Sequence, residues 1–232
     1  MPYFYVDYWY LILVMPALLL SLWAQFRVKS TFSKYSNKGV ACGMTGASAS
    51  HYIQQSNGIT VGVEAVAGEL SDHFDPRSNV IRLSTPVYDR ATVAAVGVAA
   101  HETGHALQHA EGYGPVKLRT KMVPVTNFAA SISPILIIAG ILLSMKPLAY
   151  IGIALFSVAT LFQLVTLPVE FNASNRALAA LEGCGQFTAE ELKGVKKVLT
   201  AAALTYVAAL LVSFMNLLRL ILIVGGNNRR RR

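Results

Sequence analysis

The chain has 232 residues, of which 54% are hydrophobic and only 14% are charged, and its formal net charge is +8. So apolar a composition excludes a disordered chain and predicts a membrane protein. The cations lie beside apolar segments rather than in a stripe with aromatic residues, which argues against a nucleic-acid partner and favours anionic membrane lipid.

Four apolar segments are long enough to cross a bilayer. They cover approximately residues 8–26, 128–145, 148–167 and 200–224. The first has no basic N-terminal region and no small-residue cleavage site, so we expect an uncleaved anchor. The predicted fold is therefore mainly α, a multi-pass protein of the cell membrane, with a helical bundle and a small α+β zincin-like cytoplasmic region.

These segments divide the chain into five predicted parts. Residues 1–26 form the N-terminal anchor, 27–126 a soluble region, 127–167 a transmembrane hairpin, 168–198 a helix and loop, and 199–232 a last transmembrane segment with a basic tail. The positive-inside rule puts the soluble region in the cytoplasm, because four cations follow the first segment closely. These are Arg27, Lys29, Lys34 and Lys38.

The end of the chain fits this topology less well. Four crossings would leave the four arginines at 229–232 outside, and Asn216 and Arg219 interrupt the last apolar segment. That segment could be re-entrant, or tilted with Arg219 facing the bundle, or Arg219 could extend to the interface.

The soluble region begins with a predicted helix that Thr45 caps, that runs through Gln54 and that ends at Asn57 and Gly58. Strands are predicted at 59–63 and 79–84, with a turn at 75–78 between them. If the second strand is a sheet edge beside the helix that follows, its free backbone groups could align an extended peptide.

That next helix carries the motif His101-Glu102-Thr103-Gly104-His105. Two histidines four residues apart share one helix face and can hold one Zn²⁺, while Glu102 can act as general base toward water. The preceding residues 91–100 are apolar and mostly small, so the motif is predicted to lie in a helix buried in protein. This apolar run is too short to cross a membrane.

A catalytic zinc site needs a third protein ligand. His109 lies eight residues beyond His101, or about 12 Å of helix rise, so one ion does not reach both in an unbroken helix. Glu170 is the better candidate, because two membrane crossings separate it from the motif and return it to the same side. We therefore expect one zinc ion per chain, held by His101, His105 and Glu170.

Four segments together resemble the bacterial YugP-type neutral zinc metallopeptidases over nearly the whole chain. They are LSDHFDP at 70–76, VIRLS at 80–84, VGVAAHETGHALQH at 96–109 and EFNAS at 170–174. That family is similar in turn to the HtpX and CAAX-prenyl-protease group of membrane gluzincins. The resemblance implies His101, His105 and Glu170 as zinc ligands and Glu102 as general base.

One position departs from the HtpX-like pattern, in which an Asp follows the ligand Glu by four residues. Here that position is Ser174, followed by Asn175. Either side chain could hydrogen-bond a ligand histidine, although a neutral partner raises the basicity of the histidine less than a carboxylate does.

The expected activity is that of a membrane-bound zinc endopeptidase, a hydrolase that uses metal-activated water on membrane-associated or misfolded polypeptides. The oxyanion needs a further hydrogen-bond donor, and spacing does not choose among the candidates. These candidates are His73, His109, Tyr113 and Arg176.

Two alternatives stay open at this point. A site-2-protease-like intramembrane enzyme takes its third ligand from a Leu-Asp-Gly segment, for which this chain offers Leu181-Glu182-Gly183. A non-catalytic scaffold stabilised by zinc is the other, although a retained Glu102 beside an open three-ligand site argues against it. The sequence carries no signal for the oligomeric state.

Overall fold

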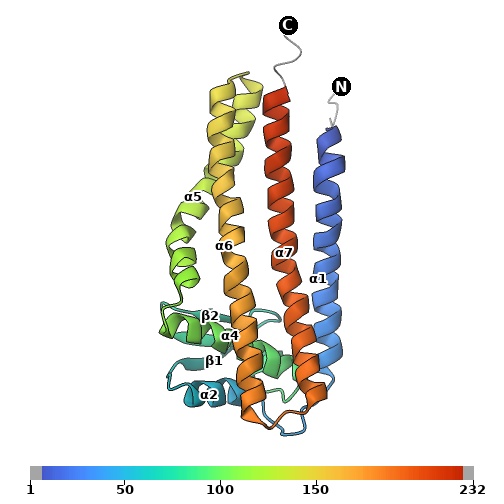
Figure 1. Cartoon of the computed structure of the whole chain (residues 1–232), viewed down its shortest axis with the longest axis vertical. Helices are drawn as coiled ribbons and strands as arrows, with labels where there is room; N and C mark the ends of the chain where they lie inside the picture. Colours follow the sequence, from blue (N-terminus) through green and yellow to red (C-terminus); the bar gives the residue numbers. More distant parts are fainter. Residues whose placement is uncertain (1–6, 227–232) are drawn as a thin grey trace. The chain divides into compact units, whose positions relative to one another are not determined.

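The computed structural model describes residues 7–226, so the four terminal arginines and the first six residues lie outside it. The protein is 76% helical and has a small three-stranded sheet (Figure 1). Four of its helices are long and apolar enough to cross a membrane. The prediction of a mainly helical multi-pass protein with a small α+β region is therefore confirmed.

The described residues form seven α-helices and three strands. The helices are α1 (Met15–Ser36, preceded by a π-helical turn at Tyr10–Val14), α2 (Gly46–Ser56), α3 (Thr85–Tyr88), α4 (Val93–Ala110), α5 (Gly114–Leu142), α6 (Lys146–Cys184) and α7 (Ala189–Gly226). The strands are β1 (Gly62–Val66), β2 (His73–Asp75) and β3 (Val80–Ser84). They belong to two compact units, and the long helices α1, α5, α6 and α7 have residues in both.

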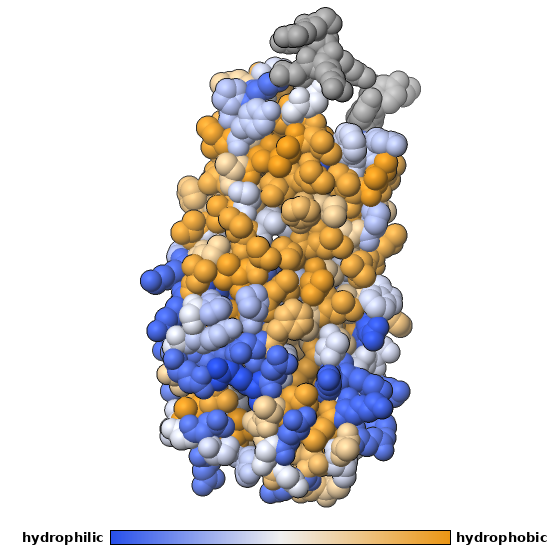
Figure 2. Space-filling model, in the orientation of Figure 1, coloured by the Kyte–Doolittle hydropathy of each residue, from blue (hydrophilic) through white to orange (hydrophobic). Residues whose placement is uncertain are grey.

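The first unit contains Leu118–Leu167, the chain up to Ala24 and the chain from Thr205. Many of its large apolar side chains are exposed, and they cover much of the face shown in Figure 2. Such a surface suits hydrocarbon better than water. Small residues let α5 and α6 approach closely, since a Cβ atom at Gly140 would lie 2.4 Å from the backbone nitrogen of Ala149.

The polar residues near the end of α7 have partners in this unit. The Nε atom of Arg219 donates to Asp7 at 2.8 Å, and its Nη1 atom lies 3.3 Å from the Asn216 side-chain oxygen. Its guanidinium carbon lies 5.1 Å from the centre of the Tyr10 ring. The helix itself continues through these residues. Arg219 is thus paired with an acid 212 positions away, and α7 is not interrupted.

The second unit contains Gln25–Lys117 and Pro168–Leu204. Its helix α2 is the helix that the sequence predicts: the Thr45 side chain accepts from the Ser48 backbone nitrogen, and Asn57 is the C-cap. Gly58 then takes the left-handed conformation, with φ at +66°. The apolar face of α2, which includes Ala49 and Ile53, packs into a core with α4.

The sheet has the strand order β1-β3-β2, with β1 parallel and β2 antiparallel to β3. The prediction that the strand at 79–84 forms a sheet edge is therefore wrong, because β3 is hydrogen-bonded on both sides. The short β2, which the sequence does not predict, occupies that edge, and β1 begins at Gly62 rather than at Ile59.

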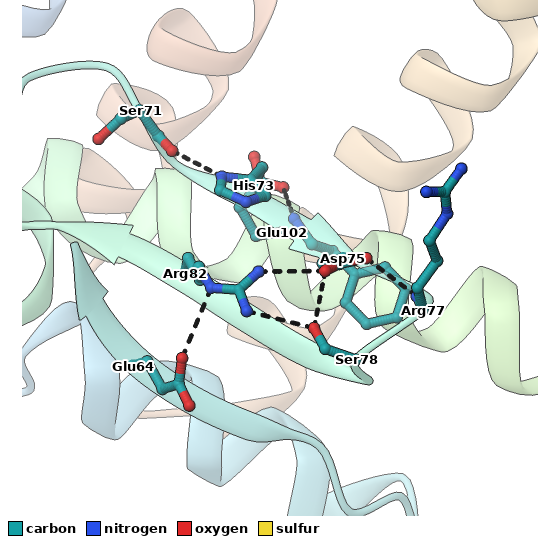
Figure 3. Close-up of polar contacts among 9 residues, drawn as sticks. Glu64, Ser71, His73, Asp75, Arg77, Ser78, Arg82 and Glu102 are labelled. Carbon is teal, nitrogen blue, oxygen red and sulfur yellow. Dashed lines mark hydrogen bonds and ion pairs between the residues drawn. The ribbon is translucent and has the colours of Figure 1, made fainter.

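A polar network holds the turn between β2 and β3, as the sequence predicts for residues 75–78 (Figure 3). The Asp75 carboxylate accepts from the Arg77 backbone nitrogen at 2.9 Å, from Ser78 Oγ at 2.7 Å and from Arg82 at 3.2 Å. Arg82 also lies 3.5 Å from Glu64 on β1. The hydrogen bonds from Ser78, Arg77 and Arg82 hold the pKa of Asp75 well below its ordinary value.

Candidate metal centre

Helix α4 carries both motif histidines. Its N-cap is Thr92, whose side chain accepts from the Ala95 backbone nitrogen at 3.2 Å. Most of the helix from Val93 to Gln108 is buried, as the small apolar residues predict. The rings of His101 and His105 lie on one face with their centres 4.7 Å apart. The spacing of the motif therefore gives two imidazoles directed to one point.

The third group comes from the part of α6 that belongs to the same unit. Gly104, inside the motif, makes the contact possible, because a Cβ atom there would lie only 2.6 Å from the backbone oxygen of Ala173. Ala173 is itself fully buried. Two small residues thus let α4 and α6 approach closely enough for Glu170 to face both histidines.

The three donor atoms fit a metal ion. Glu170 is only 2% exposed, and its Oε2 atom lies 3.4 Å from His101 Nε2 and 3.5 Å from His105 Nε2. All three ligand atoms lie within 4.8 Å of one another. Tetrahedral zinc with ligand distances of 2.0–2.1 Å separates its ligands by about 3.3 Å, so the observed spacing suits one zinc ion.

A chain of hydrogen bonds fixes the tautomer of His105. Arg176 can only donate, and its Nε atom bonds Asn172 Oδ1 at 2.7 Å. That oxygen therefore accepts from Gln108 Nε2 at 2.9 Å, and the same nitrogen donates to the Val169 carbonyl at 2.8 Å. Gln108 Oε1 must then accept from His105 Nδ1 at 3.0 Å. A proton on Nδ1 leaves the lone pair of Nε2 free to bind a metal.

His101 has a similar partner. Its Nδ1 atom lies 3.2 Å from Ser174 Oγ, on the turn of α6 that follows Glu170. Asn175, the other candidate for this contact, is exposed. Both motif histidines thus have a hydrogen-bond partner on Nδ1, as metal-binding histidines ordinarily do.

The charges around His105 also favour a cation. Burial alone lowers the pKa of His105, but the hydrogen bond to Glu170 and the negative charges of Glu102 and Glu170 outweigh burial and raise this pKa. Two carboxylates close to the partly buried imidazole of His105 attract positive charge. A proton and a divalent metal ion compete for that position, and the metal can contact all three donors at once.

The catalytic candidate Glu102 contacts the edge strand β2. Its Oε2 atom accepts from the Phe74 backbone nitrogen at 3.0 Å (Figure 3). Nearby, the half-buried Asp72 accepts from the Ser84 backbone nitrogen at 2.7 Å and from Ser84 Oγ at 3.0 Å. Burial raises the pKa of Asp72 and the Glu102 charge adds to this, against the hydrogen bonds from Ser84.

The four candidate oxyanion donors lie in two places. His73 is an exposed residue of β2, with Nδ1 2.8 Å from the Ser71 backbone oxygen, and the His109 ring lies 5.7 Å from that of Phe74. Both therefore lie near the strand that contacts Glu102. Arg176 instead forms a two-pronged ion pair with Glu111 at 2.6 and 2.7 Å, and its guanidinium carbon lies 5.9 Å from the Tyr113 ring centre.

Glu182, the ligand that a site-2-protease-like centre would need, lies twelve positions after Glu170. It is exposed, whereas the preceding Leu181 is buried. Glu182 does not belong to the group whose ligand atoms converge with His101 and His105 in the described part of the chain.

Comparison with known proteins identifies the family. Residues 10–225 match the profile of a family described as "Putative neutral zinc metallopeptidase". The chain belongs to this family. It is also 52% identical over 215 residues to the "Putative membrane protease YugP" of Bacillus subtilis (strain 168), which covers 92% of this chain and 96% of that relative. The resemblance inferred from the motifs is thus confirmed, and no solved structure is significantly similar to the chain.

In this member of the neutral zinc metallopeptidase family, sequence reasoning missed two features of the site. Gln108 follows His105 by three residues and therefore shares its helix face, which is a signal that could have identified it. The Phe74 backbone nitrogen left no such signal, because a backbone donor has no side-chain identity and β2 is only three residues long.

Proposed function

We propose that the protein is a membrane-bound, zinc-dependent endopeptidase, with His101, His105 and Glu170 as the ligands of one zinc ion and Glu102 as the general base. The observation that carries this proposal is the convergence of three ligand atoms at zinc spacing, next to a carboxylate bound to a sheet edge. Membership of the metallopeptidase family supports the same reaction class.

Zinc held there would polarise a peptide carbonyl and make a water molecule more acidic. Glu102 accepts the proton of the attacking water and then delivers it to the leaving amine, so that its net charge is unchanged at the end of a cycle. The Phe74 N–H group holds one carboxylate oxygen and leaves the other free for this transfer. Gln108 and Ser174 keep the two imidazoles oriented.

The substrates we propose are membrane-associated or misfolded polypeptides, cleaved on the cytoplasmic side. Support for this side comes from the sequence, since cations follow the first apolar segment and flank the later ones. Strand β2 is the sheet edge next to Glu102, so it replaces β3 as the strand along which an extended peptide would align.

The test uses purified protein in detergent with a casein substrate, with and without a chelator. Glu102→Gln keeps the size and one hydrogen-bonding oxygen of the side chain but removes its basicity. We expect this variant to retain a full equivalent of zinc and to lose at least about a thousandfold in hydrolysis. A wild-type protein that binds zinc but cleaves nothing, or an active Glu102→Gln variant, would contradict the proposed catalysis.

Two variants on the same helix test the assignment of Glu170 as the third zinc ligand. Glu170→Ala is expected to lose zinc as measured by metal analysis of the purified protein, whereas Glu182→Ala, on the exposed end of the same helix, is expected to keep it. Zinc loss in Glu182→Ala with retention in Glu170→Ala would instead favour the site-2-protease-like arrangement.

A further inference from the structure

A surface cavity lies in the second unit, which also contains the candidate metal centre. It is lined by the end of α1 with the residues just after it and by the beginning of α7. Its volume is about 500 Å³. Its charged and aromatic lining consists of Lys34, Tyr35, Lys38, Glu190, Lys193 and Lys197. None of these residues belongs to the zinc centre.

The contact between the two helices holds this cavity in place. A Cβ atom at Gly194 would lie 2.7 Å from a ring carbon of Tyr35, so only glycine lets the aromatic ring pack against α7. The start of α7 is fixed as well, because Thr188 and Glu191 bond each other's backbone nitrogens at 2.7 and 3.2 Å. Glu191 also accepts from the Ala41 backbone nitrogen at 2.6 Å, which ties α7 to the segment after α1.

The lysines create a strong positive field. Lys34 lies in the last turn of α1 and Lys38 in the bend two residues after that helix ends, while Lys193 and Lys197 are four positions apart on one face of α7. Glu190 is the single carboxylate in the lining, and its ion pair with Lys38 is long, at 3.5 Å. Four exposed ammonium groups against one carboxylate leave three net positive charges around the cavity, which attract an anion.

The cavity also has features that suit a bound anion. The ammonium groups of Lys34 and Lys38 lie 5.9 and 5.7 Å from the centre of the Tyr35 ring, so both extend along the same aromatic wall. A carboxylate would bring one charge, whereas a phosphate group brings several acceptor oxygens that separate lysines can bind as point charges.

We propose that this lysine pocket binds the phosphate group of an anionic ligand. The headgroup of an anionic phospholipid and free inorganic phosphate share this chemistry. A lipid headgroup as the source of the phosphate fits the positions of the lysines in the chain. Lys34 and Lys38 follow the apolar segment of α1, and Lys193 and Lys197 precede the apolar segment of α7.

The test measures the thermal unfolding midpoint of the full-length protein in a non-ionic detergent. One arm adds short-chain phosphatidylglycerol, a second adds short-chain phosphatidylcholine, and a third adds sodium phosphate against sodium chloride of equal ionic strength. The pocket variant is Lys34→Gln/Lys193→Gln. The control is Lys29→Gln/Lys196→Gln, which removes the same charge from the same two helices outside this lining.

We expect phosphatidylglycerol, inorganic phosphate or both to raise the midpoint of the wild type and of the control, and phosphatidylcholine to have no such effect. In the pocket variant the ligand concentration needed for half the shift should rise about thirtyfold, since each surface lysine contributes about fivefold. A shift with phosphatidylglycerol alone assigns the lipid as the source, and a shift with both assigns the phosphate group itself. Equal responses of pocket and control variants, or no response of the wild type to either phosphate source, would overturn the proposal.

Discussion

Replacing Gln108 by Leu tests whether a side chain that hydrogen-bonds His105, without contacting the metal itself, affects zinc binding. The Gln108 side chain is fully buried and makes three hydrogen bonds, to His105 Nδ1, the Val169 carbonyl and Asn172 Oδ1. Leu fills a similar volume but makes none of them. Asn172 keeps its bond from Arg176 and the Val169 carbonyl keeps its helical bond within α6, so the His105 N–H group is the one left without a partner.

A buried group left without a partner costs about 1–3 kcal/mol, so the free energy of unfolding should fall by about that amount. Zinc affinity should fall about 10- to 100-fold, because the imidazole of His105 is no longer oriented and made more basic. Competition with a chromophoric chelator measures the affinity, and thermal unfolding measures the stability.

Two further variants separate these effects. Gln108→Glu retains an acceptor for His105 but has no donor for Val169, so it should lose stability while binding zinc at least as tightly as the wild type. Gln54→Leu removes a similarly buried glutamine that bonds Ser50 and the Val61 backbone nitrogen, away from the ligands, so it should lose stability alone. Wild-type zinc affinity in Gln108→Leu, or an equal loss in Gln54→Leu, would show that Gln108 does not orient His105 for metal binding.

Two other predictions follow from the packing of α4 and from the turn after β2. Gly104→Ala puts a methyl group 2.6 Å from the Ala173 backbone oxygen, so it should separate Glu170 from the histidines and lower the bound zinc, whereas Gly183→Ala, at a position with open space, should keep it. Metal analysis of both purified variants checks this, and full zinc occupancy in Gly104→Ala would contradict it. Asp75→Asn should lower the thermal midpoint at pH 7. Because hydrogen bonds from Ser78, Arg77 and Arg82 lower the pKa of Asp75 in the folded state, their contribution is present above the ordinary Asp pKa near 4 and is lost as pH falls toward the lower folded value. The difference in midpoint between wild type and Asp75→Asn should therefore shrink below about pH 4, and a constant difference down to pH 2 would count against the assignment.

Local signals in the sequence predict the parts of the fold that depend on neighbouring residues. The cap at Thr45, the left-handed Gly58 and the turn at Asp75 each depend on residues within a few positions, and the structure has all three. The apolar segments likewise depend only on composition and length.

Features that depend on contacts between residues far apart in the sequence could not be predicted from such local signals. Strand β2 has three residues and no alternating pattern, so neither its existence nor the central position of β3 is visible before the sheet forms. The pairing of Arg219 with Asp7 spans 212 positions. At the site, the motif spacing brings His101 and His105 together, whereas the approach of Glu170 depends on the contact between Gly104 and Ala173.

The most direct test of the account is a crystal structure of the zinc-loaded protein with data collected on both sides of the zinc absorption edge. We expect one anomalous peak per chain, about 2.0–2.2 Å from His101 Nε2, His105 Nε2 and a Glu170 carboxylate oxygen. An anomalous map without a peak there, or a zinc ion bound to the histidines with Glu170 turned away and another side chain in its place, would contradict it.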